Sequence, residues 1–227
     1  DGGGIYNTGI LALVGSTVSG NYARYADGWT FTKDGSWGCE FSLGGGIDNY
    51  GTLEIVGSTV SGNVSDGGGG IGNFGVMKIV GSSVSENISD VGGAIENHGA
   101  LEIVSSTVSG NSASSGAIFN LEGHLALNSS IVAQNYTDDG ADIYNAASIS
   151  DSGCVIGKDP GFAVPPVFDG KKLANRGKLD LTPKEGSAAI DIGDNDAVKT
   201  ETDRAGNPRV AGGAVDAGAY EYQGKEK

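Results

Sequence analysis

Several residue types on which common protein classes depend are scarce in this chain. Its 227 residues include two cysteines, two histidines and five prolines. Two cysteines do not build the disulfide framework of a small secreted domain, and this pair lacks the close spacing of a zinc site. No apolar run approaches membrane-spanning length, and no signal peptide is present. The composition therefore argues against disulfide-rich, zinc-binding and membrane-inserted proteins.

Positive charge is scarce as well. The chain carries 14 lysines and arginines against 28 acidic residues, a formal net charge of −14. Such a surface repels nucleic acid and anionic membranes. We therefore expect no nucleic-acid partner and no membrane insertion, and we look for neutral glycans, proteins or cations instead.

Glycine is abundant, with 41 residues, and apolar residues recur at fixed places between the glycines. A first motif of the form GGGI-x-N occupies 2–7, 44–49, 68–73, 92–97 and 115–120, with a degenerate copy at 141–145. A second, STVSGN, or a variant of it, occupies 16–21, 58–63, 82–87, 106–111 and 130–135. After a first interval of 42 residues, both motifs keep a period near 24. Two independent motifs with one period predict a solenoid.

Short alternating stretches such as 52–56, 76–80 and 100–104 lie between the motifs, with one apolar and one polar or small face. Each coil then holds three short strands joined by turns. The sequence predicts an all-β, right-handed, single-stranded parallel β-helix of about 24 residues per coil, spanning 1–157. A capping region would follow at 158–227. Because Asp1 directly precedes a repeat, we expect the chain to be a piece of something longer.

Asparagine ends each copy of both motifs, at Asn49 and Asn63 in the second coil for example. Asparagine accepts left-handed turn geometry, and its amide can bond to the same amide one coil away. Two asparagine columns are expected to line buried corners. Hydroxyl pairs such as Thr59 and Ser61 flank the inward valines and should point outward, either as solvated strand surface or as an ice-matching grid.

The 42-residue interval inserts a loop at 22–42 that concentrates aromatic residues and contains both tryptophans. Flat rings bury sugar faces while charges orient hydroxyl groups. The candidate ligand-binding residues are Tyr22, Arg24, Tyr25, Trp29, Phe31 and Trp37. The alternative is that the loop folds onto the tube and its aromatics pack there.

The period fades after about residue 150, where DPGF, LTPKEGSAAIDIGD, TDRAGNPRV and VDAGAYEY occur. Together with the coils, these motifs resemble bacterial β-helix surface proteins that carry a choice-of-anchor Q region. The coils are also similar to the repeats of polymorphic outer-membrane proteins and related adhesins. The resemblance implies a secreted or bacterial cell-surface protein with an adhesin-like or glycan-associated role. The chain departs from the family wording at 187–191, where it reads SAAID without the usual proline.

The aspartates Asp191, Asp194 and Asp196 form a D-x-x-D-x-D pattern that offers several hard oxygens to calcium. No other cofactor is expected. The alternative is that Arg204 and Arg209 pair with nearby aspartates while Tyr220 and Tyr222 close the end of the tube.

An enzyme is the second class of function considered, because many β-helices cleave polysaccharides. The weak catalytic candidates, in adjacent coils at equivalent or nearly equivalent positions, are His98, His124, Glu96 and Glu122. Beside them, Glu54, Lys78 and Glu102 are expected in one outward column, and a solvated charge ladder is the plain interpretation.

The sequence thus predicts a secreted or cell-surface module, non-catalytic and monomeric, that binds an extracellular glycan or a host or neighbouring-cell protein through 22–41. The alternative is a polysaccharide lyase or glycoside hydrolase of the pectate-lyase-like kind, and a structural stalk or ice-binding surface is a minor alternative. Cys39 and Cys154 lie several coils apart, so two free thiols are expected.

Overall fold

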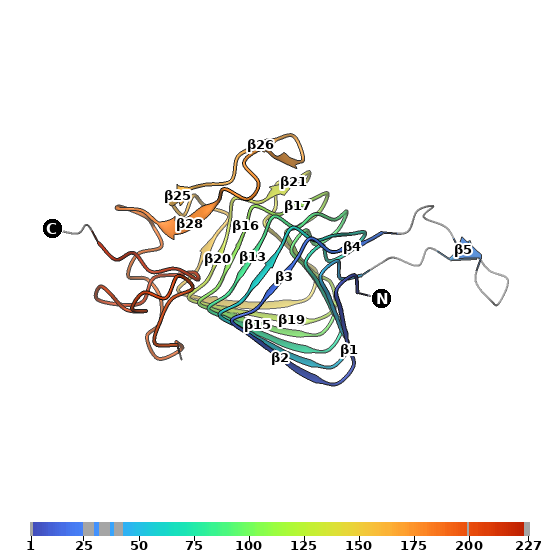
Figure 1. Cartoon of the computed structure of the whole chain (residues 1–227), viewed down its shortest axis with the longest axis horizontal. Coiled ribbons are helices and arrows are strands. Elements are labelled where there is room, and N and C mark those ends of the chain that lie inside the picture. Colours follow the sequence, from blue (N-terminus) through green and yellow to red (C-terminus); the bar gives the residue numbers. More distant parts are fainter. Residues whose placement is uncertain (1, 25–29, 32–36, 39–42, 199, 225–227) are drawn as a thin grey trace.

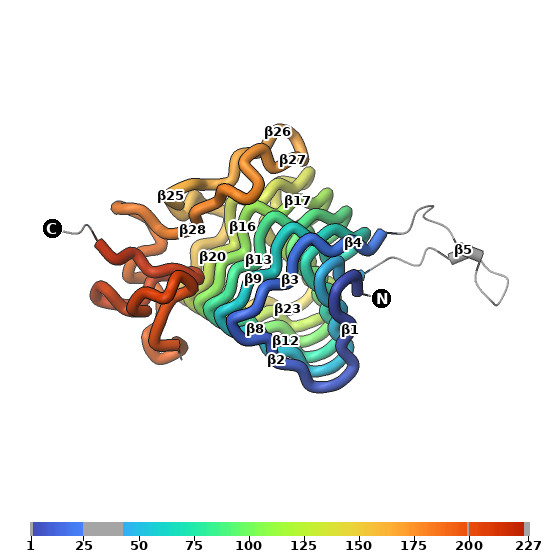
Figure 2. Tube along the Cα trace, viewed as in Figure 1, coloured from blue at the N-terminus to red at the C-terminus, as the bar shows by residue number. Residues whose placement is uncertain are grey.

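A computed structural model describes residues 2–24, 30–31, 37–38, 43–198 and 200–224. Within these ranges the chain is all-β and contains no helix. Figure 1 shows the strands stacked as successive coils of one tube with three flat faces, and Figure 2 follows the same coils along the Cα trace. The predicted parallel β-helix is confirmed.

Three parallel sheets of six strands each form the faces of the tube in the described ranges. Sheet A contains β1 (Ile5–Asn7), β7 (Ile47–Asn49), β11 (Ile71–Asn73), β14 (Ile95–Asn97), β18 (Ile118–Asn120) and β22 (Ile143–Asn145). Sheet B contains β2 (Ile10–Val14), β8 (Thr52–Val56), β12 (Val76–Val80), β15 (Ala100–Val104), β19 (His124–Asn128) and β23 (Ser148–Ser152). Sheet C contains β3 (Thr17–Ser19), β9 (Thr59–Ser61), β13 (Ser83–Ser85), β16 (Thr107–Ser109), β20 (Ile131–Val132) and β24 (Val155–Ile156).

The repeat sets the register of every sheet. Ile5 pairs with Ile47 across the long interval, and Ile47 pairs with Ile71 across a standard one. Short pairs, β4 (Tyr22–Ala23) with β10 (Val64–Ser65) and β17 (Ser112–Ala113) with β21 (Tyr136–Thr137), lie between sheets C and A. The 18 extra residues of the first interval therefore fall in the sequence between β4 and the second coil, and the register of the stack is the same on both sides of them.

The core consists of apolar columns that run along the tube. Leu53, Ile55, Val60 and Ile71 and their equivalents as far as the fifth coil are at most 3% exposed, whereas Ile149 in the last coil is 41% exposed. Their alternation with outward residues follows from the strand period of two. Each coil buries its apolar face on its neighbours, which explains why a glycine-rich chain with few aromatics still has a continuous core.

Both asparagine columns form hydrogen-bonded ladders. Asn49 Nδ2 donates to Asn73 Oδ1 at 2.8 Å, and Asn63 Nδ2 donates to Asn87 Oδ1 at 2.9 Å. The expected amide ladder is confirmed, but the expected left-handed backbone at asparagine is wrong. No described asparagine has a positive φ; in the second motif the preceding residue has it, such as Gly62 at 68° or Glu86 at 61°.

The C-terminal region lies alongside sheet C rather than over the end of the tube. It contains the antiparallel pairs β25 (Phe162–Val164) with β28 (Asp180–Pro183) and β26 (Phe168–Asp169) with β27 (Lys172–Leu173). Arg204 Nη2 donates to Thr59 Oγ1 at 2.8 Å, and the Ala219 amide donates to Thr107 Oγ1 at 2.9 Å. Figure 1 shows this region, in orange and red, beside β13, β16 and β20.

This placement corrects two expectations from the sequence. Tyr220 and its neighbours reach strands of the middle coils, so the prediction that Tyr220 and Tyr222 close the end of the tube is wrong. The outward hydroxyls are exposed at Thr17 in the first coil, but Thr107 in the fourth is fully buried. A second apolar cluster, which includes Ile131, Phe162, Leu181 and Ala217, covers the hydroxyl row of sheet C in the later coils.

Candidate functional site

A groove crosses the outward face of sheet B. Its main cavity, of about 420 Å³, is lined by Glu54, Val56, Lys78, Val80, Glu102, Val104, Asn128, Ala197 and Thr200. An adjoining depression of about 340 Å³ shares Lys78 and Glu102 and extends over Val76 and Ala100 to His124. Together the two hollows follow successive coils, so the groove has the shape of a track for an extended ligand.

Three charged side chains form one column on the groove floor. Lys78 pairs in register with Glu54 on one side and with Glu102 on the other. Lys78 Nζ lies 2.9 Å from Glu102 Oε2, and both side chains are nearly half exposed. The predicted outward column is confirmed. Two carboxylates against one ammonium leave the floor acidic, which disfavours polyuronates and suits a neutral polyol.

The C-terminal region forms one wall of this groove. Ala197 and Thr200 lie beside sheet B, where Val80 and Val104 are buried while Val14 in the first coil is 68% exposed. The Asp194 amide donates to Ser129 Oγ at 2.7 Å and fixes the start of the wall. The Thr200 hydroxyl in the wall is buried, without a hydrogen-bond partner among the described residues.

An aromatic ladder lies where the strands of sheet B begin, at the turns that lead from sheet A to sheet B. The rings of Tyr50, Phe74 and His98 stack with centroids 4.8 and 4.7 Å apart and planes within 8°. Tyr6 leans on Tyr50 at 5.6 Å. The sequence analysis missed this ladder, although a ring recurs after the first-motif asparagine in three successive coils.

The glycine after each ladder residue is required by the close approach of the coils. A Cβ at Gly75 would lie 2.0 Å from the carbonyl oxygen of Gly51, and a Cβ at Gly99 would lie 2.0 Å from that of Gly75. Backbone oxygen atoms cannot move away as a side chain could. The glycines therefore allow the turns of neighbouring coils to stack closely, and this stacking brings the ladder rings into contact.

The predicted histidine pair does not form. His124 pairs in register with Ala100, two positions beyond His98, and the imidazoles have different partners. His98 Nε2 lies 2.9 Å from Glu96 Oε1, whereas His124 Nδ1 lies 2.9 Å from Ser148 Oγ. The shift arises because the two histidines are 26 residues apart in the sequence, whereas paired residues of these strands are 24 apart. His124 borders the groove, and Glu122 is exposed on the turn before it.

Two buried carboxylates lie on the outward side of sheet A. Asp48 and Glu96 are 1% and 9% exposed and flank Gly72 in register. Burial, with the negative charge of Glu96 adding to it, raises the pKa of Asp48 to about 6. This pair lies outside the groove, beneath the turns that begin the first motif.

The aromatic loop is described only at its base and in one strand pair. Tyr22 is 68% exposed, while Arg24 lies 3.6 Å from Asp90 and donates from Nε to the Ser65 carbonyl oxygen at 3.1 Å. In the antiparallel pair of β5 (Thr30–Phe31) and β6 (Trp37–Gly38), the backbone register pairs Phe31 with Trp37. Tyr25, Trp29 and Cys39 lie outside the described residues.

Two of the three calcium candidates accept hydrogen bonds from backbone amides. Asp191 Oδ1 accepts from the Ala214 amide at 3.0 Å, and Asp194 Oδ1 accepts from the Asp196 amide at 2.9 Å. In the described ranges no three His, Cys, Asp or Glu side chains are arranged to hold a metal ion. The calcium site stays a prediction.

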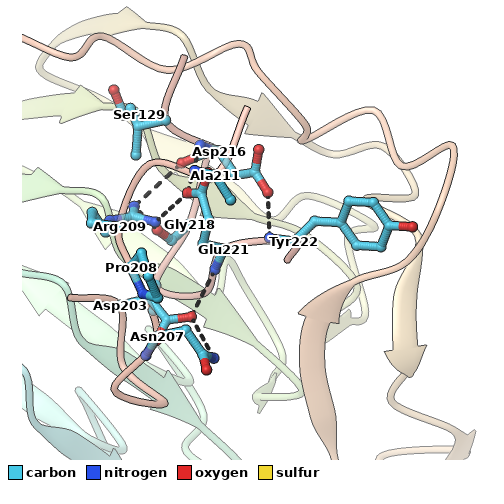
Figure 3. A network of polar contacts seen from close by, with 12 residues as sticks. Ser129, Asp203, Asn207, Pro208, Arg209, Ala211, Asp216, Gly218, Glu221 and Tyr222 are labelled. Atoms are coloured by element: carbon cyan, nitrogen blue, oxygen red, sulfur yellow. Dashed lines mark hydrogen bonds and ion pairs between the residues drawn. The ribbon is translucent and has the colours of Figure 1, made fainter. Parts of the chain in front are cut away.

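The distinctive C-terminal motifs build a buried charge network (Figure 3). Arg209 Nη1 lies 3.1 Å from Glu221 Oε2, and both residues are at most 2% exposed. The ion-pair partner of Arg209 is therefore Glu221, not one of the aspartates expected from the sequence. Burial lowers the pKa of Arg209 and raises that of Glu221, and Asp203 Oδ2 accepts from the Glu221 amide at 3.0 Å. The network joins Asp203, Arg209 and the 216–221 segment to one another within the C-terminal region.

Cys154 carries a free thiol in the last coil. Its sulfur accepts from the Ser130 amide at 3.4 Å, and burial raises the pKa of the thiol. A raised pKa keeps the thiolate, the nucleophilic form, scarce at neutral pH. Cys154 therefore contributes to packing rather than to chemistry.

Comparison with known proteins yields no match to any family model, curated protein or solved structure. The likeness to choice-of-anchor Q proteins stays a prediction, and the parallel β-solenoid is what the structure shows. In the described part of the chain, no helix is long and apolar enough to cross a membrane.

Proposed function

We propose that this chain is a secreted or cell-surface module that binds a neutral glycan along the groove of sheet B. The observation that carries the proposal is an in-register charge column on the floor of a groove that the C-terminal region borders. Glu54, Lys78 and Glu102 lie on the floor, and Ala197 and Thr200 lie on one side.

Each part of the groove suits a polyhydroxylated polymer. Half-exposed carboxylates and an ammonium can exchange water for sugar hydroxyls without being left unpaired. Val76 and Ala100 offer apolar patches to the faces of sugar rings, and His124 adds a further hydrogen-bonding group. Successive coils place equivalent strand positions about 4.8 Å apart, and this regular spacing favours a linear glycan chain that runs along the tube.

The secreted location and the adhesin-like role rest on the resemblance of the terminal motifs and on the acidic charge. The aromatic insertion 22–41 would then be a second contact for the same glycan or for a protein. This placement of the primary site in the groove differs from the sequence-based prediction, which assigned it to the insertion.

A glycan array in calcium-containing buffer tests the proposal with three proteins. They are the wild-type chain, the groove variant Lys78→Gln/Glu102→Gln and the insertion variant Trp29→Ala/Trp37→Ala. The groove variant removes both members of the ion pair between Lys78 and Glu102, so neither is left without the other. We expect binding of a neutral glycan that the groove variant loses by at least tenfold.

Binding lost only in the insertion variant would move the site to 22–41. If no protein binds any glycan, the glycan proposal fails, and protein adhesion or a structural stalk becomes the better account.

A second candidate is hydrolysis of the bound glycan, and the spacing of Glu54 and Glu102 favours it. The two residues are separated by two coils, or about 9.6 Å at one sheet spacing per coil. Carboxyl groups of inverting glycosidases are about 6.5–9.5 Å apart, which leaves room for a water molecule. The backbone separation is close to the upper end of that range.

A reducing-end assay on the glycan identified by the array tests this second candidate. Hydrolysis should be lost in Glu54→Gln and kept in Glu122→Gln, a matched change outside the groove. Equal activity in the two variants, or no product from the wild-type chain, would leave the groove as a binding site only.

A further inference from the structure

A second cavity lies between the C-terminal region and the corner of the tube that joins sheets C and A. It measures about 480 Å³, within the usual range for small-molecule sites. The residues that line it are Glu86, Ile88, Gly110, Ser112, Lys171, Lys172, Leu173, Ala174 and Arg176. The cavity is separate from the groove of sheet B, since the two share no lining residue.

The walls of this cavity are mainly apolar. Ile88 comes from the turn after β13, between coils, and Leu173 and Ala174 come from the end of the β26–β27 hairpin. Ile88 bridges to Val64 and Ser112 in the neighbouring coils, so its position is fixed. The Ser112 hydroxyl is buried and has no hydrogen-bond partner among the described residues. An apolar body with a polar group near Ser112 would match this surface.

The rim is cationic, although the chain as a whole carries a charge of −14. Lys171 Nζ is occupied by Asp138 at 2.5 Å, and Arg176 Nη2 donates to the Gly62 carbonyl oxygen at 2.8 Å. Lys172 is exposed, and no ion pair or hydrogen bond of its side chain occurs in the described part of the chain. Arg176 Nε also lies 3.7 Å from Glu86 Oε2, so among the described lining residues Lys172 is the cation still available.

We propose that this cavity binds an amphipathic monocarboxylate, with its carboxylate on Lys172 and its aliphatic chain against Ile88 and Leu173. The unpaired ammonium of Lys172 disfavours a cation. The apolar walls disfavour a sugar and a polyanion, because hydroxyl groups and additional charges would be desolvated there. The site is independent of the glycan proposal.

Titration calorimetry with octanoate tests the inference, with octanol as the uncharged analogue of equal chain length. Octanoate is expected to bind the wild-type chain at least tenfold more tightly than octanol. Lys172→Gln, which keeps most of the side chain but removes the charge, should weaken octanoate binding about tenfold and leave octanol unchanged. Lys184→Gln, a lysine of the same region outside the cavity, should bind like wild type.

The thermal midpoint of each variant confirms that it is folded, which is expected because both lysines are exposed. Three outcomes would overturn the proposal: no binding of octanoate, equal affinities for octanoate and octanol, or equal losses in Lys172→Gln and Lys184→Gln.

Discussion

The coils and the C-terminal region bury polar groups in opposite ways. In the coils, each asparagine amide donates to the next and accepts from the one before, as at Asn63, Asn87 and Asn111. The ladder is neutral and every member has the same role. In the C-terminal region, Arg209 and Glu221 are charged, deeply buried and unique.

This difference concerns the free-energy cost of burying polar groups. In the repeat, many identical residues share this cost, whereas in the irregular region a few unique residues carry it. An amide is donor and acceptor at once, so identical residues satisfy one another in any number of coils. A guanidinium needs a partner of opposite charge at a set place, and removing one partner leaves the other as a buried, uncompensated charge. Substitutions in the two regions should therefore have unequal effects.

The largest effect is expected for Arg209→Met, because it leaves Glu221 charged in an apolar surrounding. We expect a loss of about 3–5 kcal/mol in the free energy of unfolding. Urea denaturation followed by circular dichroism measures it, and hydrogen exchange should show the loss first in 158–222. The exposed Arg176→Met serves as a control with a loss below about 1 kcal/mol. Equal losses of stability in Arg209→Met and Arg176→Met would contradict the view that the C-terminal region depends on its buried ion pair.

A smaller effect is expected for Asn87→Ala in the middle of a ladder. The change removes the acceptor of the Asn63 amide groups and the donor to the Val60 carbonyl oxygen. Unsatisfied buried groups of this kind cost about 1–3 kcal/mol. Asn21→Ala, at the half-exposed start of the same ladder, should cost less, and the same urea titration compares them. A larger loss at Asn21 than at Asn87 would contradict the ladder as a source of stability.

The buried carboxylate of the coils gives a pH-dependent test. Because burial raises the pKa of Asp48 from 3.8 to about 6, the folded state holds its proton more tightly than the unfolded state does. This stabilising contribution is complete below the ordinary pKa and is lost as the pH rises through about 6. Asp48→Asn should therefore be more stable than wild type by roughly 1–2 kcal/mol at pH 8, with little difference at pH 4.

Thermal unfolding between pH 4 and pH 8 measures the effect of Asp48→Asn. Because burial is the main cause, the difference should persist in about 0.5 M salt, which screens exposed charges. A stability difference that is the same at both pH values would rule out this explanation.

The smallest effect on stability is expected for the groove floor. Lys78→Gln/Glu102→Gln removes a half-exposed ion pair, and such pairs contribute about 0–1 kcal/mol. The variant should unfold in urea almost as wild type does, even though we expect it to lose glycan binding. A loss above about 2 kcal/mol would mean that the column is part of the stability of the stack rather than a surface free to bind.

Both candidate sites arise where the two regions meet. The groove takes its floor from β8, β12 and β15 and one wall from Ala197 and Thr200, and the second cavity lies between Ile88 of the coils and Leu173 of the hairpin. Neither region alone forms either cavity. The comparison therefore also explains why the sites were hard to foresee from the repeats.

The sequence by itself determined the coils. The 24-residue spacing of Ile47, Ile71 and Ile95 fixes which residues pair, because a strand stacked on its own repeat has one register that buries every apolar side chain. The same spacing predicted the asparagine ladders and the charge column of Lys78. It also contained the ring ladder of Tyr50, Phe74 and His98, which follows the same period.

Only the tertiary structure decided where the C-terminal region lies, since it has no period and its contacts with the coils join residues far apart in the sequence, such as Arg204 and Thr59, which are 145 positions apart. That packing buries Thr107, selects Glu221 as the partner of Arg209 and raises a wall beside sheet B. A repeat predicts contacts with its own copies, whereas the docking of a unique segment depends on the shape and charge of a surface that exists only after the coils have stacked.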